Sequence, residues 1–142
     1  MRKFVFAGII ALAASACASS EMPLSSDPSE ASVVSAVGQT FDLRPGQTAR
    51  VGNDGLVVGF RGVASDSRCA IDVQCVWAGD AEVRIPVTAS RSDWTSLALH
   101  TTLEPKSATF RNYRITVVGL NPAPRSTARI DSNNYVVTLR VE

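Results

Sequence analysis

Most of the residues whose side chains could carry chemistry lie in one stretch, from Asp66 to Asp80. It holds Cys69 and Cys75, two of the chain's three cysteines, with five residues between them. In an exported protein, two cysteines this close are more often bridged than free. The spacing therefore predicts a structural disulfide. Closing so short a loop stabilises a fold by about 2 to 2.5 kcal/mol in the loop-entropy model.

Metal and redox chemistry fit these two cysteines poorly. Cys-x₅-Cys is not a usual zinc spacing, and the sequence has no second Cys/His pair to complete four ligands. The redox spacing would be Cys-x-x-Cys. Asp66, Asp72 and Asp80 are weak candidates for a hard cation such as calcium, although they lack the EF-hand spacing. We expect no metal and no cofactor, and we interpret the aspartates as turn caps and as ion-pair partners of Arg68.

The sequence contains few side chains arranged in a way that favours enzymatic catalysis. Any catalytic account that uses an imidazole must use His100, the single histidine, and no nucleophile motif accompanies it. The alternating pattern around His100 places it on the polar face of a strand. Hydrolysis by paired carboxylates would need no histidine, but no sequence feature favours it. We therefore predict no catalytic residues and a protein that is not an enzyme.

The first 16 residues have the pattern of an export signal. Arg2 and Lys3 precede an uncharged, mostly apolar run over residues 4–14, which is too short to span a bilayer as a helix. Small residues then lead to Ala16, where a signal peptidase would cleave, and Cys17 follows at once. This order resembles a bacterial lipoprotein signal. The alternative is ordinary secretion, which would leave Cys17 as an odd thiol in an oxidising compartment.

The lipoprotein resemblance implies that Cys17 becomes the mature N-terminus and carries acyl chains, palmitate among them. Each buried CH₂ contributes about 0.8 kcal/mol, so more than one chain gives stable membrane anchoring. Ala18 follows the cysteine, which in that family resembles sorting to the outer membrane of a Gram-negative cell. We expect a lipid-anchored protein of the cell envelope that faces the periplasm in such a host.

A Ser-rich segment separates this signal from the rest of the chain. Residues 17–38 contain two prolines and no clear apolar period, which predicts a flexible tether with a reach of roughly 25 Å. A short strand at 33–37 is a weak signal within it. Residues 39–142 are then the single folded domain.

From residue 39 onward the apolar period is two, which predicts β-strands. The expected strands cover residues 41–43, 47–51, 56–63, 81–88, 93–103, 108–110, 113–120 and 135–141. Gly59 and Gly62 indicate a bulge or a close backbone approach in the third strand, and Pro86 indicates an edge strand or a bulge. We predict an all-β fold, an antiparallel immunoglobulin-like β-sandwich, with a small β-barrel as the alternative.

The stretch that begins at Asp66 also carries a distinctive motif. Asp66-Ser-Arg68-Cys69, followed by Asp72-Val-x-Cys75-Val-Trp77-Ala-Gly79-Asp80, resembles a motif of small bacterial lipoproteins of uncharacterised function. That family commonly has Pro after the first cysteine, where this chain has Ala70. The resemblance implies no activity. We expect Trp77 to pack over the disulfide and fill the core, and Gly79 to adopt a positive φ.

The overall charge offers no field to steer a polyanion. The formal net charge is +1, and removal of Arg2 and Lys3 leaves 12 of the 14 basic residues against 13 acidic ones. We expect no nucleic-acid partner. The most economical function is a non-catalytic binding or structural module, held at the membrane by its anchor.

Four features could contact an envelope protein or polymer. They are the loop that contains Trp77, the loops at 90–94 and 122–134, and an outward stripe formed by Arg84, Arg114 and Arg140. The alternative function is a secreted inhibitor-like or calcium-binding β-domain.

Overall fold

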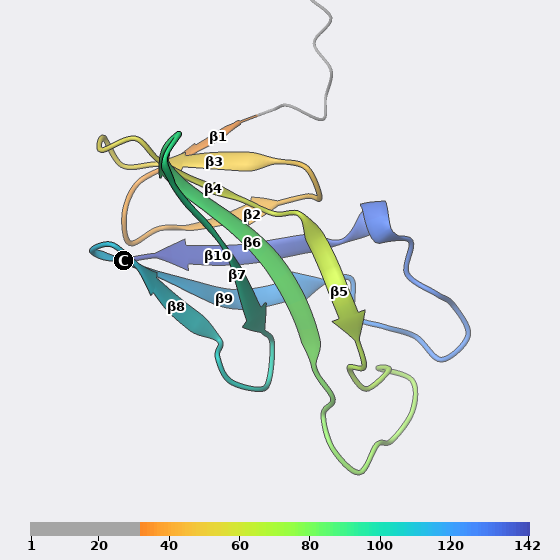
Figure 1. The fold of residues 1–142 in the computed structure, drawn as a ribbon. Helices are drawn as coiled ribbons and strands as arrows, with labels where there is room; N and C mark the ends of the chain where they lie inside the picture. The colour runs from red at the N-terminus through yellow and green to blue at the C-terminus, as the bar shows by residue number, and fades with distance from the viewer. Residues whose placement is uncertain (1–31) are drawn as a thin grey trace, which may run out of the picture.

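The structure, a computed structural model, describes residues 32–142 (Figure 1). The predicted signal peptide at 1–16, the lipidation site at Cys17 and the first part of the tether lie outside the described residues. The described chain consists of β-strands with one short 3₁₀ helix, η2 (Ser132–Asn134). The all-β prediction is confirmed. In this part of the chain, no helix is long and apolar enough to cross a membrane.

The strands form two separate sheets. The first contains β1 (Val33–Ser35), β3 (Thr48–Val51), β4 (Leu56–Gly59), β5 (Gly62–Asp66), β6 (Ala81–Ser90) and β7 (Asp93–His100). The second has the order β2 (Thr40–Leu43), β10 (Val136–Val141), β9 (Tyr113–Asn121) and β8 (Ser107–Phe110). Every pairing is antiparallel except that of β1 with β3. Neither sheet closes on itself, so the described residues do not form the barrel considered as the alternative.

Alternation along the strands builds one hydrophobic core from both sheets. In β6 the residues that point inward are Ala81, Val83, Ile85 and Val87, and all four are fully buried. The other sheet contributes the same pattern through β10, where Val137, Leu139 and Val141 are fully buried. Burying one such aliphatic side chain stabilises the fold by about 1.5 to 3 kcal/mol. The period of two in the sequence therefore predicted these inward faces correctly.

The predicted third strand is divided at Phe60 and Arg61 into β4 and β5, whereas the two glycines had suggested a bulge or a close backbone approach within one strand. Both pieces pair with the same side of β6, whose other side pairs with β7. Pro86 therefore lies in the centre of the sheet, and the edge-strand alternative is wrong. It faces the interruption, where Gly59 leaves room: a Cβ there would lie 3.0 Å from the Pro86 Cγ. The missing N–H of Pro86 is tolerated because the partner strand is broken at that point.

The folded chain begins within the segment assigned to the tether. β1 pairs with β3 through Val33 and Ala49, at the weak strand signal noted at 33–37. The domain is thus entered at β1, on one edge of the first sheet (Figure 1). The loop between β5 and β6 projects at the opposite end of the molecule. The first described strand and the loop that contains the candidate site therefore lie at opposite ends of the molecule.

Candidate functional site

The segment 67–80, called the Cys loop below, extends the β5–β6 hairpin beyond the sheet. The Ser67 N–H donates to the Asp80 carbonyl over 2.7 Å, and the Cys69 N–H donates to the Ala78 carbonyl over 2.8 Å. The predicted disulfide between Cys69 and Cys75 is present, with the two Cα atoms 6.0 Å apart. It closes the end of the hairpin, so the Cys loop projects as a covalently tied finger.

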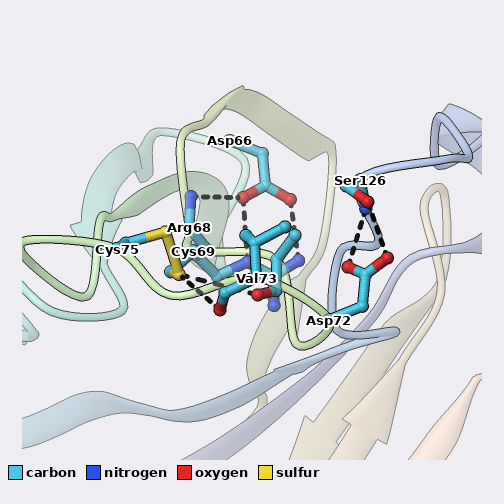
Figure 2. Close-up of a disulfide and its surroundings, with 8 residues drawn as sticks. Asp66, Arg68, Cys69, Asp72, Val73, Cys75 and Ser126 are labelled. Carbon is cyan, nitrogen blue, oxygen red and sulfur yellow. Dashed lines mark hydrogen bonds and ion pairs between the residues drawn. A yellow bond between two sulfur atoms is a disulfide. The ribbon is translucent and has the colours of Figure 1, made fainter.

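Arg68 ties the base of the Cys loop to the second sheet (Figure 2). Its guanidinium donates to both oxygens of the Asp66 carboxylate, over 2.8 and 2.7 Å. It also donates to the carbonyls of Leu120, over 2.5 Å, and Pro122, over 2.9 Å. The Tyr135 hydroxyl donates to Asp66 over 3.0 Å. Of the three aspartates considered as partners of Arg68, the structure selects Asp66.

The Asp66–Arg68 pair is largely shielded from water. The two side chains are only 11% and 13% exposed. Burial opposes ionisation of Asp66, but the hydrogen bonds and the charge of Arg68 outweigh it and hold the pKa of Asp66 below its usual value. Such a bidentate, largely buried ion pair fixes two backbone segments relative to each other.

A second set of contacts docks the Cys loop on the 122–126 segment. The Asp72 carboxylate accepts hydrogen bonds from the Ser126 N–H over 2.8 Å and from its hydroxyl over 2.6 Å (Figure 2). These two bonds lower the pKa of Asp72, although its carboxylate is exposed. The Ile71 N–H donates to the Pro124 carbonyl over 3.0 Å. The Cys loop is thereby held along one side as well as at its base.

Asp80 is the last residue of the Cys loop and lies directly before β6. It is 7% exposed and lies 2.6 Å from the His100 Nδ1. The same carboxylate accepts from the N–H groups of Thr102, over 2.9 Å, and Leu103, over 3.2 Å, and from the Thr101 hydroxyl. Burial raises the pKa of Asp80, but the His100 hydrogen bond and the turn N–H groups prevail and lower it to about 2. The aspartate therefore caps the turn that follows β7.

His100 is less accessible than the sequence suggested. Its side chain is 21% exposed, and its Nδ1 is engaged with Asp80. The strand pattern placed it on a polar face, which is correct, but did not reveal the buried carboxylate 20 residues earlier in the chain. The pair fixes the end of β7 against the start of β6.

The three aspartates do not converge on a common cation position. Asp66 engages Arg68, Asp72 engages Ser126 and Asp80 engages His100. Within residues 32–142, no group of three or more His, Cys, Asp or Glu side chains is placed to hold a metal ion. The weak calcium hypothesis therefore gains no geometric support.

Gly79 has the positive φ that the motif suggested, at 71°. A Cβ at this position would lie 1.9 Å from the Ser67 carbonyl oxygen. The two strands of the finger approach too closely for any side chain here. Gly79 is thus required by the crossing of the hairpin as well as by its own backbone conformation.

Trp77 does not occupy the place expected of it. The sequence suggested a tryptophan packed over the disulfide and filling the core, and this prediction is wrong, because Trp77 is 56% exposed. Phe60 is instead the largest of the fully buried side chains. Other side chains fill the core without Trp77. The apolar period of the sequence could not reveal this.

The end of the Cys loop exposes a group of large apolar side chains, called the apolar tip below. Its members are Ile71 at 60%, Val73 at 48%, Trp77 at 56% and Val76, which is fully exposed. These are four of the nine exposed large apolar residues of the described chain, gathered within seven positions. Scattered single apolar residues need no explanation, whereas several large apolar residues exposed on one short loop make it a candidate interaction site.

Two other surface features, the arginine stripe and a groove beside β5, give weaker support for a binding site. The arginine stripe is divided: Arg84 lies on β6 of the first sheet, whereas Arg114 and Arg140 lie on the second sheet. Arg84 pairs with Glu82, and Arg140 pairs with Glu142. An open groove of about 750 Å³ lies between β5 and the 124–130 segment. A register shift between Val63 and Ser65 distorts β5 beside it, as is usual where an edge strand is protected from pairing.

Comparison with known proteins gives no name for this arrangement. No known protein family, no curated protein and no solved structure matches the chain. The class defined here rests on the fold and the Cys loop alone: an all-β domain that projects a disulfide-closed apolar finger.

Proposed function

We propose that this protein is a lipid-anchored, non-catalytic binding module of the bacterial cell envelope, and that the Cys loop is its binding end. One observation carries the proposal. The chain enters the fold at β1, and the apolar tip projects at the opposite end of the molecule (Figure 1). A domain held by its N-terminus would therefore present this tip away from the membrane.

The anchor is supported by the sequence. Cys17 directly follows a cleavable export pattern and resembles the lipidated residue of bacterial lipoproteins. The motif from Asp66 to Asp80 resembles one found in small lipoproteins. In a Gram-negative host, Ala18 after the cysteine favours the outer membrane, with the domain in the periplasm. The rest of the segment before β1 supplies the tether.

The finer fold assignment belongs to the same proposal. Two open, mostly antiparallel sheets that share one hydrophobic core support an immunoglobulin-like β-sandwich. In such domains the loops at the ends of the sandwich are the usual binding elements. The Cys loop occupies such an end.

A specific observation also favours a second candidate, an inhibitor-like domain. A short disulfide-tied loop that projects beyond its scaffold is preorganised for insertion into a cleft, because little ordering entropy is lost on binding. This candidate needs no anchor, and it becomes the leading one if Cys17 is not lipidated.

The test of the proposed function compares the wild-type chain with Cys17→Ser in a bacterial host. We expect wild type to sediment with membranes and to have an intact mass that starts at Cys17 and includes acyl chains. Cys17→Ser removes the acylated thiol and should release most of the protein. Ser15→Ala, which keeps a small residue before the cleavage point, is the control. Unacylated wild type, or equal membrane association of both proteins, would reject the anchor.

A further inference from the structure

The face of the first sheet that points away from the core, called the outer face below, has an excess of positive charge. Arg50 of β3 and Arg84 of β6 lie on it, because the residues on either side of each are fully buried. Arg61 joins them at the break between β4 and β5. Among residues 32–142, Arg50 and Arg61 make no ion pair, whereas Arg84 pairs with Glu82 over 2.6 Å.

Few negative groups offset these arginines. Glu82 is the only acidic residue that the described strands of this sheet place on the outer face. The other carboxylates of the sheet and its turns already have partners: Asp54 with Tyr113, Asp66 with Arg68, Asp80 with His100 and Asp93 with Arg111. The bordering turns add two exposed arginines, Arg44 and Arg91. The outer face is therefore complementary to an anion.

The strand register places these groups in adjacent rows across β3, β4, β6 and β7. One row consists of Arg50, Val57, Thr88 and Trp94. The middle row consists of Thr48, Gly59, Pro86 and Ser96, and the row beyond it contains Arg84 and Ala98. Diagonal neighbours in adjacent rows are about 7 to 8 Å apart, within reach of long and aromatic side chains. The arginines and the tryptophan therefore border one surface.

The middle row is the low part of this surface. Its side chains are short, and Gly59 has none. A hollow of about 340 Å³ opens there between Thr48, Pro86 and Arg61. Trp94, which is 65% exposed, stands in the row on one side of it. A chain molecule that lies along the middle row would meet an indole and guanidinium groups.

Three kinds of side chain on the outer face match three parts of one ligand. Arginine binds the paired oxygens of a carboxylate or a phosphate in bidentate geometry. The exposed indole of Trp94 is a large, flat apolar surface, which fits the C–H face of a sugar ring. Thr48, Thr88 and Ser96 supply hydroxyl groups, which both donate and accept hydrogen bonds, as sugar hydroxyls do.

We infer that the outer face binds an acidic glycan, a sugar polymer with carboxylate or phosphate groups, along the row from Thr48 to Ser96. Trp94 stacks on a sugar ring, and Arg50 and Arg61 bind acidic groups from the two sides of the row. This surface is separate from the Cys loop. The inference therefore goes beyond the proposed function and depends on neither the anchor nor the apolar tip.

Isothermal titration of the full chain, purified in a neutral detergent, tests the inference. The probes are a mannuronate hexamer, which carries carboxylates, a phosphorylated mannose hexamer, and neutral mannohexaose. We expect at least one acidic hexamer to bind at least about tenfold more tightly than mannohexaose. Replacing Arg50 and Arg61 together by Gln should weaken that binding at least about tenfold. Trp94→Ala should weaken it at least about fivefold, and Trp94→Phe, which keeps a flat ring, should restore most of the loss.

Arg114→Gln is the matched control. Arg114 is an exposed arginine on β9 of the second sheet, and it makes no ion pair within residues 32–142. Its replacement should leave the affinity within about twofold of wild type. Thermal unfolding of each variant checks that it is folded.

Several results would overturn the inference: no binding of either acidic hexamer, equal binding of mannohexaose, an equal loss in Arg114→Gln, or no loss in the arginine double variant or in Trp94→Ala. Tighter binding of poly-L-glutamate, of a single-stranded oligonucleotide, or of vesicles of phosphatidylethanolamine and phosphatidylglycerol would also overturn it. Those three results would identify an acidic peptide, a nucleic acid or a lipid surface as the ligand. Each of these outcomes is independent of Cys17-dependent membrane association, so the proposed function would stand.

Discussion

Asp80 joins the base of the finger to the end of β7 and the turn that follows it. Its buried carboxylate binds His100 and two turn N–H groups, and its pKa falls from 3.8 to about 2. A carboxylate whose folded pKa is depressed stabilises the fold above its unfolded pKa and loses that contribution as the pH falls through the folded value. The contribution of Asp80 at neutral pH is about 2 kcal/mol.

Asp80→Asn should therefore remove about 2 kcal/mol of unfolding free energy at pH 7. The difference between wild type and variant should shrink as the pH is lowered from about 4 towards 2, because the wild-type carboxylate is protonated in that window. Urea unfolding of both proteins across this range measures it. A difference that stays constant from pH 6 to pH 2 would contradict the assignment.

Gly79 gives a second residue-scale prediction, with Gly55 as its matched control. Both glycines have a positive φ, 71° and 77°, but only at Gly79 would a Cβ collide with backbone atoms. Gly55→Ala should cost about 1 to 2 kcal/mol of backbone strain. Gly79→Ala should cost about 3 kcal/mol or more, because the hairpin strands must separate. Equal losses in thermal or urea unfolding would show that the close approach to Ser67 does not exist.

At the scale of elements, the Cys loop should behave as a unit distinct from the sheets. Its disulfide lies beyond the last residues of β5 and β6 and contributes nothing to the common core. Replacing Cys69 and Cys75 together by Ser should lower the unfolding free energy by about 2 to 2.5 kcal/mol and leave the sheets folded. The tip should then become sensitive to proteases.

Limited proteolysis with mass mapping checks this prediction. New cuts should fall within residues 70–78 of the double variant, and hydrogen-exchange protection of β6 and β10 should match wild type. Cuts spread over all strands would mean that the disulfide supports the whole fold. An unchanged cleavage pattern would mean that hydrogen bonds to Ser126 and Pro124 suffice to hold the loop.

The elements differ in how far the sequence could predict them. Strands with one fully buried face, such as β6 and β10, follow from a period of two, because the pleat sends alternate side chains to the core. Gly59 and Gly62 indicated an irregularity in the predicted third strand, but not its division into β4 and β5. The disulfide followed from cysteine spacing and expected compartment.

The site was predicted less completely, because its contacts join distant parts of the chain. Arg68 reaches the carbonyl of Leu120, 52 residues later, and Asp72 binds Ser126, 54 residues later. No local pattern encodes such partners. The exposure of Trp77 was missed for a related reason: whether a tryptophan is covered depends on what the rest of the fold places against it, and here nothing covers it fully.

For the whole molecule, the proposal is that anchor and binding end lie at opposite poles. The described chain enters the fold at the start of β1, and the apolar tip lies beyond the ends of β5 and β6 (Figure 1). The fold between them is then a spacer as well as a scaffold. A loop that instead dipped into the anchoring membrane would invert this arrangement.

Fluorescence quenching of Trp77 in the lipidated Trp94→Phe variant, reconstituted in vesicles, tests the arrangement most directly. Trp77 is then the single tryptophan of the chain. If the tip points away from the membrane, aqueous acrylamide should quench its emission as strongly as in the soluble Cys17→Ser form, and brominated lipid should not quench it. Strong quenching by brominated lipid, with protection from acrylamide, would show that the tip is inserted in the bilayer and would contradict the proposal.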